Sequence, residues 1–156
     1  MKTKISLRKF ESLIEALVGL PINFVWKGYG SAIFLEFGKL TKNKKQNHPQ
    51  GEFSVMLDCE WRIEKSRSIF FGSSSGLKRI ENQISKLLNE RVQSIHLLGL
   101  LPEIQICLSR SLRIVSFCTS EGQPDWTIFL PNKSYIYCRG GCLIFEEKQK
   151  NNENRI

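Results

Sequence analysis

The chain has 156 residues, of which 23 are lysine or arginine and 15 are aspartate or glutamate, so its formal net charge is +8. This length fits one domain with a sizeable hydrophobic core, which needs no disulfide framework or metal to hold it together. The N-terminus lacks the apolar segment of a signal peptide, and no apolar run approaches the roughly 18 residues of a membrane span. We therefore expect a soluble, cytoplasmic protein with one domain over residues 1–147 and a polar tail at 148–156.

The predicted elements begin with a helix that starts after Ser6, a plausible N-cap, and stops at Gly19. A second amphipathic helix is predicted at 77–89, after a glycine- and serine-rich loop in which Ser74 or Ser75 serves as its cap. Alternating apolar residues predict strands at 22–27, 31–37, 53–64, 67–71, 92–100, 103–108, 112–118, 126–130, 134–139 and 142–146. The order predicts an α+β fold, with two amphipathic helices packed on a large, mainly antiparallel curved sheet or pair of sheets.

The two halves of the chain resemble each other weakly. A shift of 71 residues superposes eight apolar or glycine positions of the first half on eight of the second without a gap. Each half then continues to a tryptophan strand, at Trp61 and Trp126, followed by one more strand. The pattern predicts an internal duplication of a helix-plus-strands unit, with repeats at 6–72 and 77–146, whose two tryptophans are buried at related places. Chance similarity between two alternating segments is the alternative.

The positive charge is concentrated in the first third of the chain, where residues 1–45 hold nine basic and three acidic side chains. A localised basic field favours an acidic partner, which can be a protein face or a nucleic acid. The candidate partner-binding residues are Lys27, Tyr29, Lys39, Lys42, Lys44 and Lys45. Aromatic residues beside lysine, as in Trp26-Lys27-Gly28-Tyr29, can stack on bases where they are exposed. The alternative is that the lysine-rich loop is only solvated.

The five cysteines are expected to be free thiols in a reducing compartment, since an odd number argues against a closed disulfide framework. Cys59, Cys107 and Cys118 lie in alternating strands, where a free cysteine behaves as a small core residue. Cys138 and Cys142 have the spacing of a metal-ligand pair, but structural zinc typically needs a second pair. A glycine turn between two strands explains the spacing better, so the sequence predicts neither a metal nor a cofactor.

Three carboxylates are the main candidates for acid–base chemistry. Asp58 and Glu60 share a strand face, and Asp125 precedes Trp126 as Glu60 precedes Trp61, so the three could converge. The simpler expectation is ion pairing with Arg62, Arg110 or Arg113. Nucleophile elbows, dinucleotide fingerprints and zinc-helix motifs are absent from the sequence. The sequence thus favours a non-catalytic protein and predicts no catalytic residues.

The least generic segments are Leu101-Pro-Glu-Ile-Gln-Ile-Cys-Leu-Ser109 and Ser116-Phe-Cys-Thr-Ser-Glu-Gly-Gln-Pro-Asp-Trp126. Over about residues 90–130 the chain resembles small uncharacterised bacterial cytosolic proteins, some of them immunity-like. The resemblance implies binding and neutralisation of a protein toxin, and it implies no site residues. Immunity proteins against nucleases are commonly acidic, so the net charge of +8 departs from that pattern. We expect a protein-interaction module, with a nucleic-acid-binding protein as the alternative and a hydrolase third.

Overall fold

The computed structural model describes residues 1–42 and 44–148, so most of the predicted polar tail lies outside the described residues. The helical elements are α1 (Leu7–Ile14), α2 (Leu77–Gln83) and two short 3₁₀ helices, η1 (Glu15–Leu17) and η2 (Ile84–Leu87). The strands are β1 (Lys2–Ile5), β2 (Ile22–Lys27), β3 (Ile33–Phe37), β4 (Phe53–Leu57), β5 (Trp61–Lys65), β6 (Ser68–Gly72), β7 (Val92–Leu98), β8 (Glu103–Leu108), β9 (Leu112–Ser116), β10 (Trp126–Phe129), β11 (Tyr135–Arg139) and β12 (Cys142–Glu146). No helix in the described part of the chain has the length and apolar character needed to cross a membrane.

Both predicted helices form, but each tightens into a 3₁₀ turn before its predicted end. The Oγ of Ser6 accepts a hydrogen bond of 3.1 Å from the backbone N–H of Lys9, which confirms the predicted cap of α1. The predicted serine cap of α2 is wrong. Gly76 occupies that position without a side-chain cap, and the Oγ of Ser75 instead accepts from the N–H of Gly72 at 2.8 Å.

The strands form two antiparallel sheets. The larger has seven strands in the order β1-β12-β11-β10-β4-β3-β2, and the smaller has five in the order β6-β5-β9-β8-β7. The single strand predicted at 53–64 is two strands in different sheets, because the chain leaves the larger sheet at 58–60 and enters the smaller one as β5. The edge strand β1, which pairs with β12, was not predicted from the sequence.

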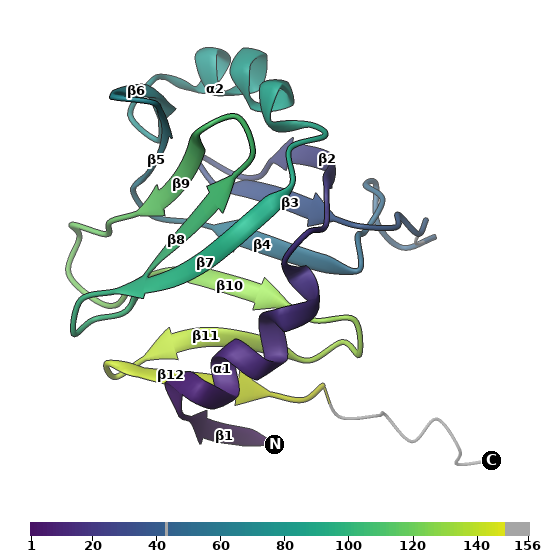
Figure 1. The fold of residues 1–156 in the computed structure, drawn as a ribbon, viewed down its shortest axis with the longest axis vertical. Helices are drawn as coiled ribbons and strands as arrows, with labels where there is room; N and C mark the ends of the chain where they lie inside the picture. The colour runs from purple at the N-terminus through teal and green to yellow at the C-terminus, as the bar shows by residue number, and fades with distance from the viewer. Residues whose placement is uncertain (43, 149–156) are drawn as a thin grey trace.

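One hydrophobic core includes the inward side chains of both sheets. In Figure 1, strands β7 to β9 of the smaller sheet lie in front of β3 and β4 of the larger sheet. Trp61 and Trp126 are 3% and 1% exposed, as predicted. Each indole N–H donates a 2.8 Å hydrogen bond to a backbone carbonyl, that of Ser31 for Trp61 and that of Pro102 for Trp126. Phe10 of α1 meets Trp126 edge to face at 6.3 Å, so the first helix is tied to this core.

The two halves of the chain meet in hydrogen bonds that come in matching pairs. The N–H of Gly19 donates to the carbonyl of Val92, and the N–H of Asn89 donates to the carbonyl of Ile22, both at 2.8 Å. These four residues flank an isolated antiparallel bridge between Pro21 and Arg91. Apart from β1 at the start and β12 at the end, each half has the same order of helix, 3₁₀ turn and five strands, three of which lie in one sheet and the last two in the other.

A disulfide joins the two segments that cross between the sheets. Cys59 follows β4 and Cys118 follows β9, and their sulfur atoms are bonded. The crossing segments also exchange backbone hydrogen bonds, from Asp58 N–H to the carbonyl of Asp125 at 3.0 Å and from Phe117 N–H to the carbonyl of Glu60 at 2.8 Å. In this structure Cys59 and Cys118 are therefore not the free thiols expected from the sequence, because the crossover brings together two cysteines that are far apart in sequence.

Candidate functional site

The outer face of the seven-stranded sheet carries aromatic and other large apolar side chains. Paired residues of an antiparallel sheet point to the same side, so the strand register assigns each side chain to a face. Eight half-buried side chains on this outer side form what we call the aromatic face: Phe24, Trp26, Phe34, Met56, Phe129, Tyr135, Tyr137 and Ile144. The inward residues between them, such as Leu35 and Ile128, are fully buried. The inner surface of this sheet is therefore apolar, and the outer surface carries large apolar side chains among polar ones such as Glu36, Ser54 and Thr127.

The outer face of the five-stranded sheet is mainly polar over its inner strands. The strands present Ser94, His96, Gln105, Cys107, Arg113, Val115, Arg62 and Glu64 there, and two exposed apolar side chains, Ile69 and Leu98, lie on the same side on the edge strands β6 and β7. Glu64 pairs with Arg62 at 2.7 Å and with Arg113 at 3.8 Å across this surface. Two sheets of similar strand order thus differ in the chemistry of their outer faces. Folding does not require aromatic side chains on an outer surface, so we take the aromatic face as the candidate functional site.

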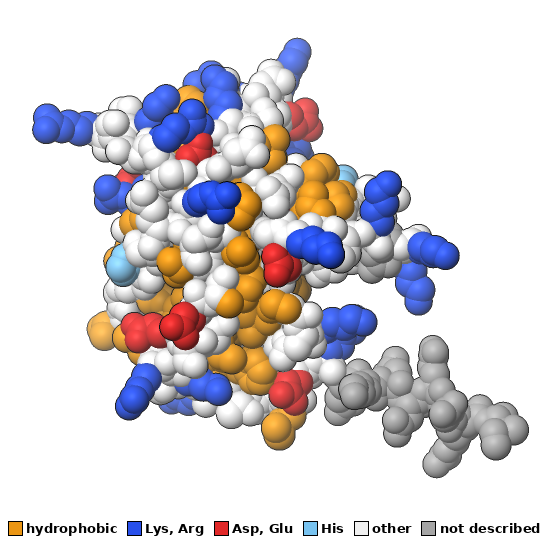
Figure 2. Space-filling model, turned by 45° about the vertical axis from the view of Figure 1, so that its right-hand side comes forward, with side chains coloured by type: hydrophobic (Ala, Val, Ile, Leu, Met, Phe, Trp, Pro, Cys, Tyr) orange, Lys and Arg blue, Asp and Glu red, His pale blue; other side chains and the backbone are white. Residues whose placement is uncertain are grey.

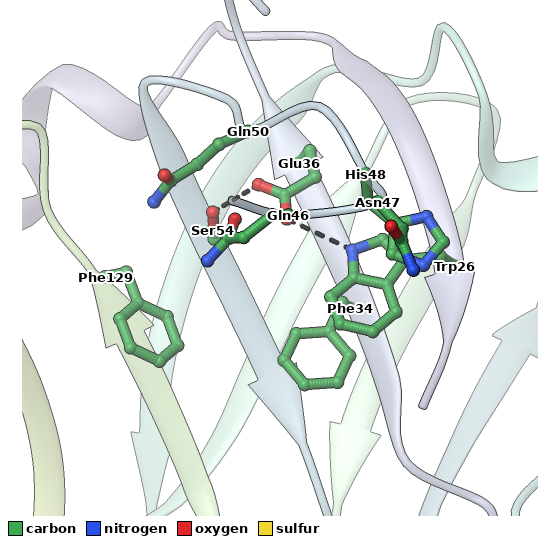
Figure 3. Close-up of a pocket in the computed structure, with 9 residues that line it drawn as sticks. All are labelled: Trp26, Phe34, Glu36, Gln46, Asn47, His48, Gln50, Ser54 and Phe129. Carbon is green, nitrogen blue, oxygen red and sulfur yellow. Dashed lines mark hydrogen bonds between the residues drawn. The ribbon is translucent and has the colours of Figure 1, made fainter. Parts of the chain in front are cut away.

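A pocket of about 310 Å³ opens on the aromatic face beside the loop at 38–52 (Figure 3). Phe34 stacks on one side of the Trp26 indole at 3.8 Å between ring centroids, and His48 stacks at 4.4 Å. Phe129 of β10 and Phe34 of β3 lie apart on two sides of the pocket, and the carboxylate of Glu36 lies above both rings in this view, beside Ser54. The other lining residues are Gln46, Asn47, Gln50 and Ser54. The pocket combines aromatic walls with a polar floor.

Glu36 is the acidic group of this pocket and is only 4% exposed. Its Oε1 accepts from the indole Nε1–H of Trp26 at 3.3 Å, and its Oε2 accepts from the N–H of Gly51 at 3.0 Å and from the hydroxyl of Ser54. All three donors are neutral. Burial of a carboxylate is costly unless hydrogen bonds or a cation compensate it, so the site holds this side chain in a fixed position at some cost.

The loop that closes the pocket is fixed at its base. Thr41 and Gln50 exchange two backbone hydrogen bonds, of 2.8 and 2.9 Å. A side chain at Gly51 would place its Cβ 2.5 Å from the carbonyl oxygen of Phe37, so only glycine fits where the loop rejoins β4. The base of the loop, and with it the pocket wall, is therefore held by backbone contacts.

The predicted lysines of this loop are exposed. Lys39, Lys42, Lys44 and Lys45 all lie on its outer part, next to the segment that lines the pocket. Figure 2 shows Lys and Arg side chains projecting at separate places around one side of the molecule, with hydrophobic surface between them. The basic groups on this side border apolar surface and do not gather into one patch.

The remaining two predicted residues lie at the turn between β2 and β3. Tyr29 is 99% exposed at its tip. The Nζ of Lys27 donates to the carbonyls of Gly28 and Gly30 at 3.0 and 2.9 Å, so this ammonium is engaged by its own turn. Of the two, Tyr29 is the one whose side chain is open to solvent.

The three predicted carboxylates do line one cleft, of about 430 Å³, together with the disulfide. The hydroxyl and N–H of Thr119 donate to Glu60 at 2.7 and 3.1 Å and lower the pKa of Glu60. Burial, and then the charge of Asp58, raise the pKa of Asp125.

The arginines expected to pair with these acids lie elsewhere. Arg62 and Arg113 pair with Glu64, and Arg110 pairs with Glu90. That expectation is therefore wrong. In place of an arginine, Glu60 has the 119–120 segment as its partner and ties this crossing segment to the start of β5.

The cysteines do not form the candidate ligand pair suggested by their spacing. Cys138 is paired with Leu143 on the inner face of the sheet, whereas Cys142 is paired with Arg139 on the outer face. Burial raises the pKa of the Cys138 thiol. The sulfurs of Cys59 and Cys118 lie within 4.8 Å of a Glu60 carboxylate oxygen. As long as they are bonded to each other, neither is the thiolate that zinc requires.

The sequence interpretation missed the aromatic face, although its signal is present. In a strand with one solvated side, apolar and polar residues alternate, as in Trp61-Arg62-Ile63-Glu64-Lys65 of β5. In β11 both alternating sets are apolar or aromatic over Tyr135-Ile136-Tyr137-Cys138, and in β3 the outward Phe34 lies between the inward Ile33 and Leu35. Such strands favour burial on both sides. In the described structure, only part of the 38–52 loop covers the outer side.

Comparison of the chain with protein-family models, curated proteins and solved structures finds no match.

Proposed function

We propose that this chain is a non-catalytic protein-interaction module that binds its partner through the aromatic face. The observation that carries the proposal is the contrast between the two outer sheet faces. Centres of protein interfaces are enriched in Tyr, Trp, Phe and Met and depleted in Lys and Glu, with a charged rim around them. The aromatic face has that composition, and Trp26, Tyr135 and Tyr137 are the large rigid side chains that dominate binding energy in interfaces.

The rim of this face is basic at both ends. Lys2 and Lys4 of β1 point outward at one edge, where Lys2 pairs with Glu146 at 3.6 Å, and the exposed lysines of the loop between β3 and β4 lie toward the opposite side of the sheet. Charge complementarity favours a partner with an apolar centre and an acidic rim, since such a surface would be steered toward the lysines. In its concrete form we propose neutralisation of a protein toxin, as the resemblance at residues 90–130 implies.

A photo-crosslinking amino acid tests this proposal. Thr127 lies at the middle of the aromatic face between Met56 and Tyr137, and Gln105 lies in the corresponding central part of the polar face. We expect the photo-crosslinking amino acid to capture one protein in cells of the native host when it replaces Thr127. In place of Gln105 it should capture none. Cross-links to nucleic acid from Thr127 would favour the nucleic-acid alternative, and equal labelling from both positions would contradict a dedicated face.

We also propose that the fold arose by internal duplication. The support is the shared element order, the matching hydrogen bonds around Pro21 and Arg91, and strand bulges at Ile22/Phe24 and Val92/Ser94. Because β5 pairs with β9 and β4 pairs with β10, each sheet contains strands of both halves, and neither half can complete a sheet alone. Fragments 1–74 and 75–148 should therefore fold only when they are mixed. A fragment that folds alone would contradict a duplication in which each half completes its sheets with strands of the other half.

We propose a cytoplasmic location, as expected from the sequence, and the disulfide makes this testable. Reducing compartments keep most thiols free. If an alkylating reagent is added directly to host cells, it should modify Cys59 and Cys118 as free thiols. After purification in air, the same two cysteines should be bonded to each other. A disulfide already formed in the cells would point to an oxidising compartment.

A further inference from the structure

We propose that the pocket beside Glu36 receives the guanidinium group of an arginine from the partner protein. This inference rests on the proposed function, because it names the group that anchors the partner to the aromatic face. It is carried by three features of the pocket: a buried carboxylate, aromatic walls, and a rim of neutral amide groups.

The carboxylate of Glu36 retains capacity to accept a hydrogen bond. A carboxylate offers about four acceptor positions on its two oxygens. Oε2 takes two donors, Gly51 and Ser54, whereas Oε1 takes only the long 3.3 Å bond from Trp26. The open acceptor position is therefore on Oε1. Because the three donors are neutral, a cationic donor there would also compensate the buried charge.

The walls select a planar group. Phe34 and Phe129 contribute flat aromatic rings on two sides of the pocket, and the carboxylate of Glu36 lies above these rings in Figure 3. A guanidinium is flat, stacks on aromatic rings and donates to a carboxylate in a fixed fork, whereas an ammonium is a compact, strongly hydrated charge. The same geometry explains why the pocket favours arginine over lysine.

The rim is compatible with a cation despite the net charge of the chain. The loop contributes Gln46, Asn47, His48 and Gln50 to the lining, and no lysine or arginine of the described residues lines the pocket. The amide oxygens of Gln46 and Asn47 can accept from the remaining guanidinium N–H groups. The exposed lysines beside this segment would meet acidic residues that flank the arginine on the partner.

The three tryptophan indole N–H groups give a direct assay by nuclear magnetic resonance on the ¹⁵N-labelled chain. The indole of Trp26 donates to Glu36 at the pocket, whereas those of Trp61 and Trp126 donate to buried backbone carbonyls elsewhere. Titration with Nα-acetyl-arginine amide should shift the Trp26 indole signal saturably and leave the other two in place. Nα-acetyl-citrulline amide has the same shape without the charge and should bind at least about tenfold more weakly.

Two variants complete the test. Glu36→Gln should weaken binding of the arginine probe at least about tenfold. Glu64→Gln removes a half-buried acid from the matching face of the other sheet and should leave binding unchanged. Equal binding of the arginine and citrulline probes to the unaltered chain would overturn the proposal even if Glu36→Gln fails to fold. Saturable binding of guanosine monophosphate without binding of the arginine probe would overturn it in favour of a nucleotide site.

The outcomes separate this inference from the proposed function. If the arginine probe does not bind but Thr127 still cross-links to one protein, the anchor is wrong and the docking face stands. If the probe binds while Thr127 gives no protein cross-link, the pocket stands and the docking face is wrong.

Discussion

The disulfide between Cys59 and Cys118 should contribute a large share of the stability of this domain. It closes a loop across a sequence separation of 59 residues. In the chain-entropy treatment, a cross-link of this span stabilises the folded state by about 4 kcal/mol at 25 °C. Replacing both cysteines with serine should therefore lower the free energy of unfolding by about 4 kcal/mol, and the melting temperature by roughly 10 °C for a domain of this size.

Urea unfolding followed by tryptophan fluorescence measures this effect. The double variant and the reduced unaltered chain should share a lower midpoint than the oxidised chain. Their unfolding should also depend more steeply on urea, because an unfolded chain without the cross-link exposes more surface. Cys107→Ser, at a free and half-buried thiol, is the control and should leave the midpoint nearly unchanged. Equal midpoints for the oxidised chain and the double variant would refute the reasoning.

Three further predictions concern the acid cleft, the pocket loop and the thiols. Because burial and the charge of Asp58 raise the pKa of Asp125, its ionised form costs stability above that pKa. Asp125→Asn should accordingly raise the urea midpoint at pH 7. This increase in midpoint should vanish once the pH falls below 3.8, the ordinary pKa of an aspartate. An increase that does not depend on pH would contradict this cause. Gly51→Ala should lower the melting temperature and displace the Trp26 indole signal, since its Cβ would lie 2.5 Å from the Phe37 carbonyl oxygen; an unchanged spectrum would show that the loop base is not fixed. In the native oxidised protein, a thiol reagent should modify the half-buried Cys107 and Cys142 before the buried Cys138, whose pKa burial raises; mass spectrometry of labelled peptides gives the order, and early modification of Cys138 would count against its burial.

The sequence predicts the strands well where pairing is local. Strong alternation gives β2, β8 and β12 their observed bounds, and Ser6 gives the start of α1. The break between β4 and β5 is missed because Asp58-Cys59-Glu60 continues the alternation while the backbone crosses to another sheet. Edge strand β1 is missed because it is mostly exposed and depends on β12, at the other end of the chain.

The site is less predictable than the fold because it depends on pairing between distant strands. Phe34 and Phe129 come from β3 and β10 and become neighbours only through β4 between them. The disulfide likewise depends on the crossover. The lysines at 39–45 are recognisable as exposed from composition alone, but their place beside an aromatic pocket follows from the sheet order.

The affinity of the cross-linked partner for two matched variants tests the docking face most directly. Phe129→Ala removes an aromatic ring from the centre of the aromatic face, and Glu64→Ala alters the corresponding position of the polar face. With purified partner, calorimetry should give a dissociation constant raised at least about tenfold for Phe129→Ala, the loss typical of a central aromatic anchor, and nearly unchanged for Glu64→Ala. Equal affinities of the two variants, with both still folded, would contradict the proposal that this sheet face binds the partner.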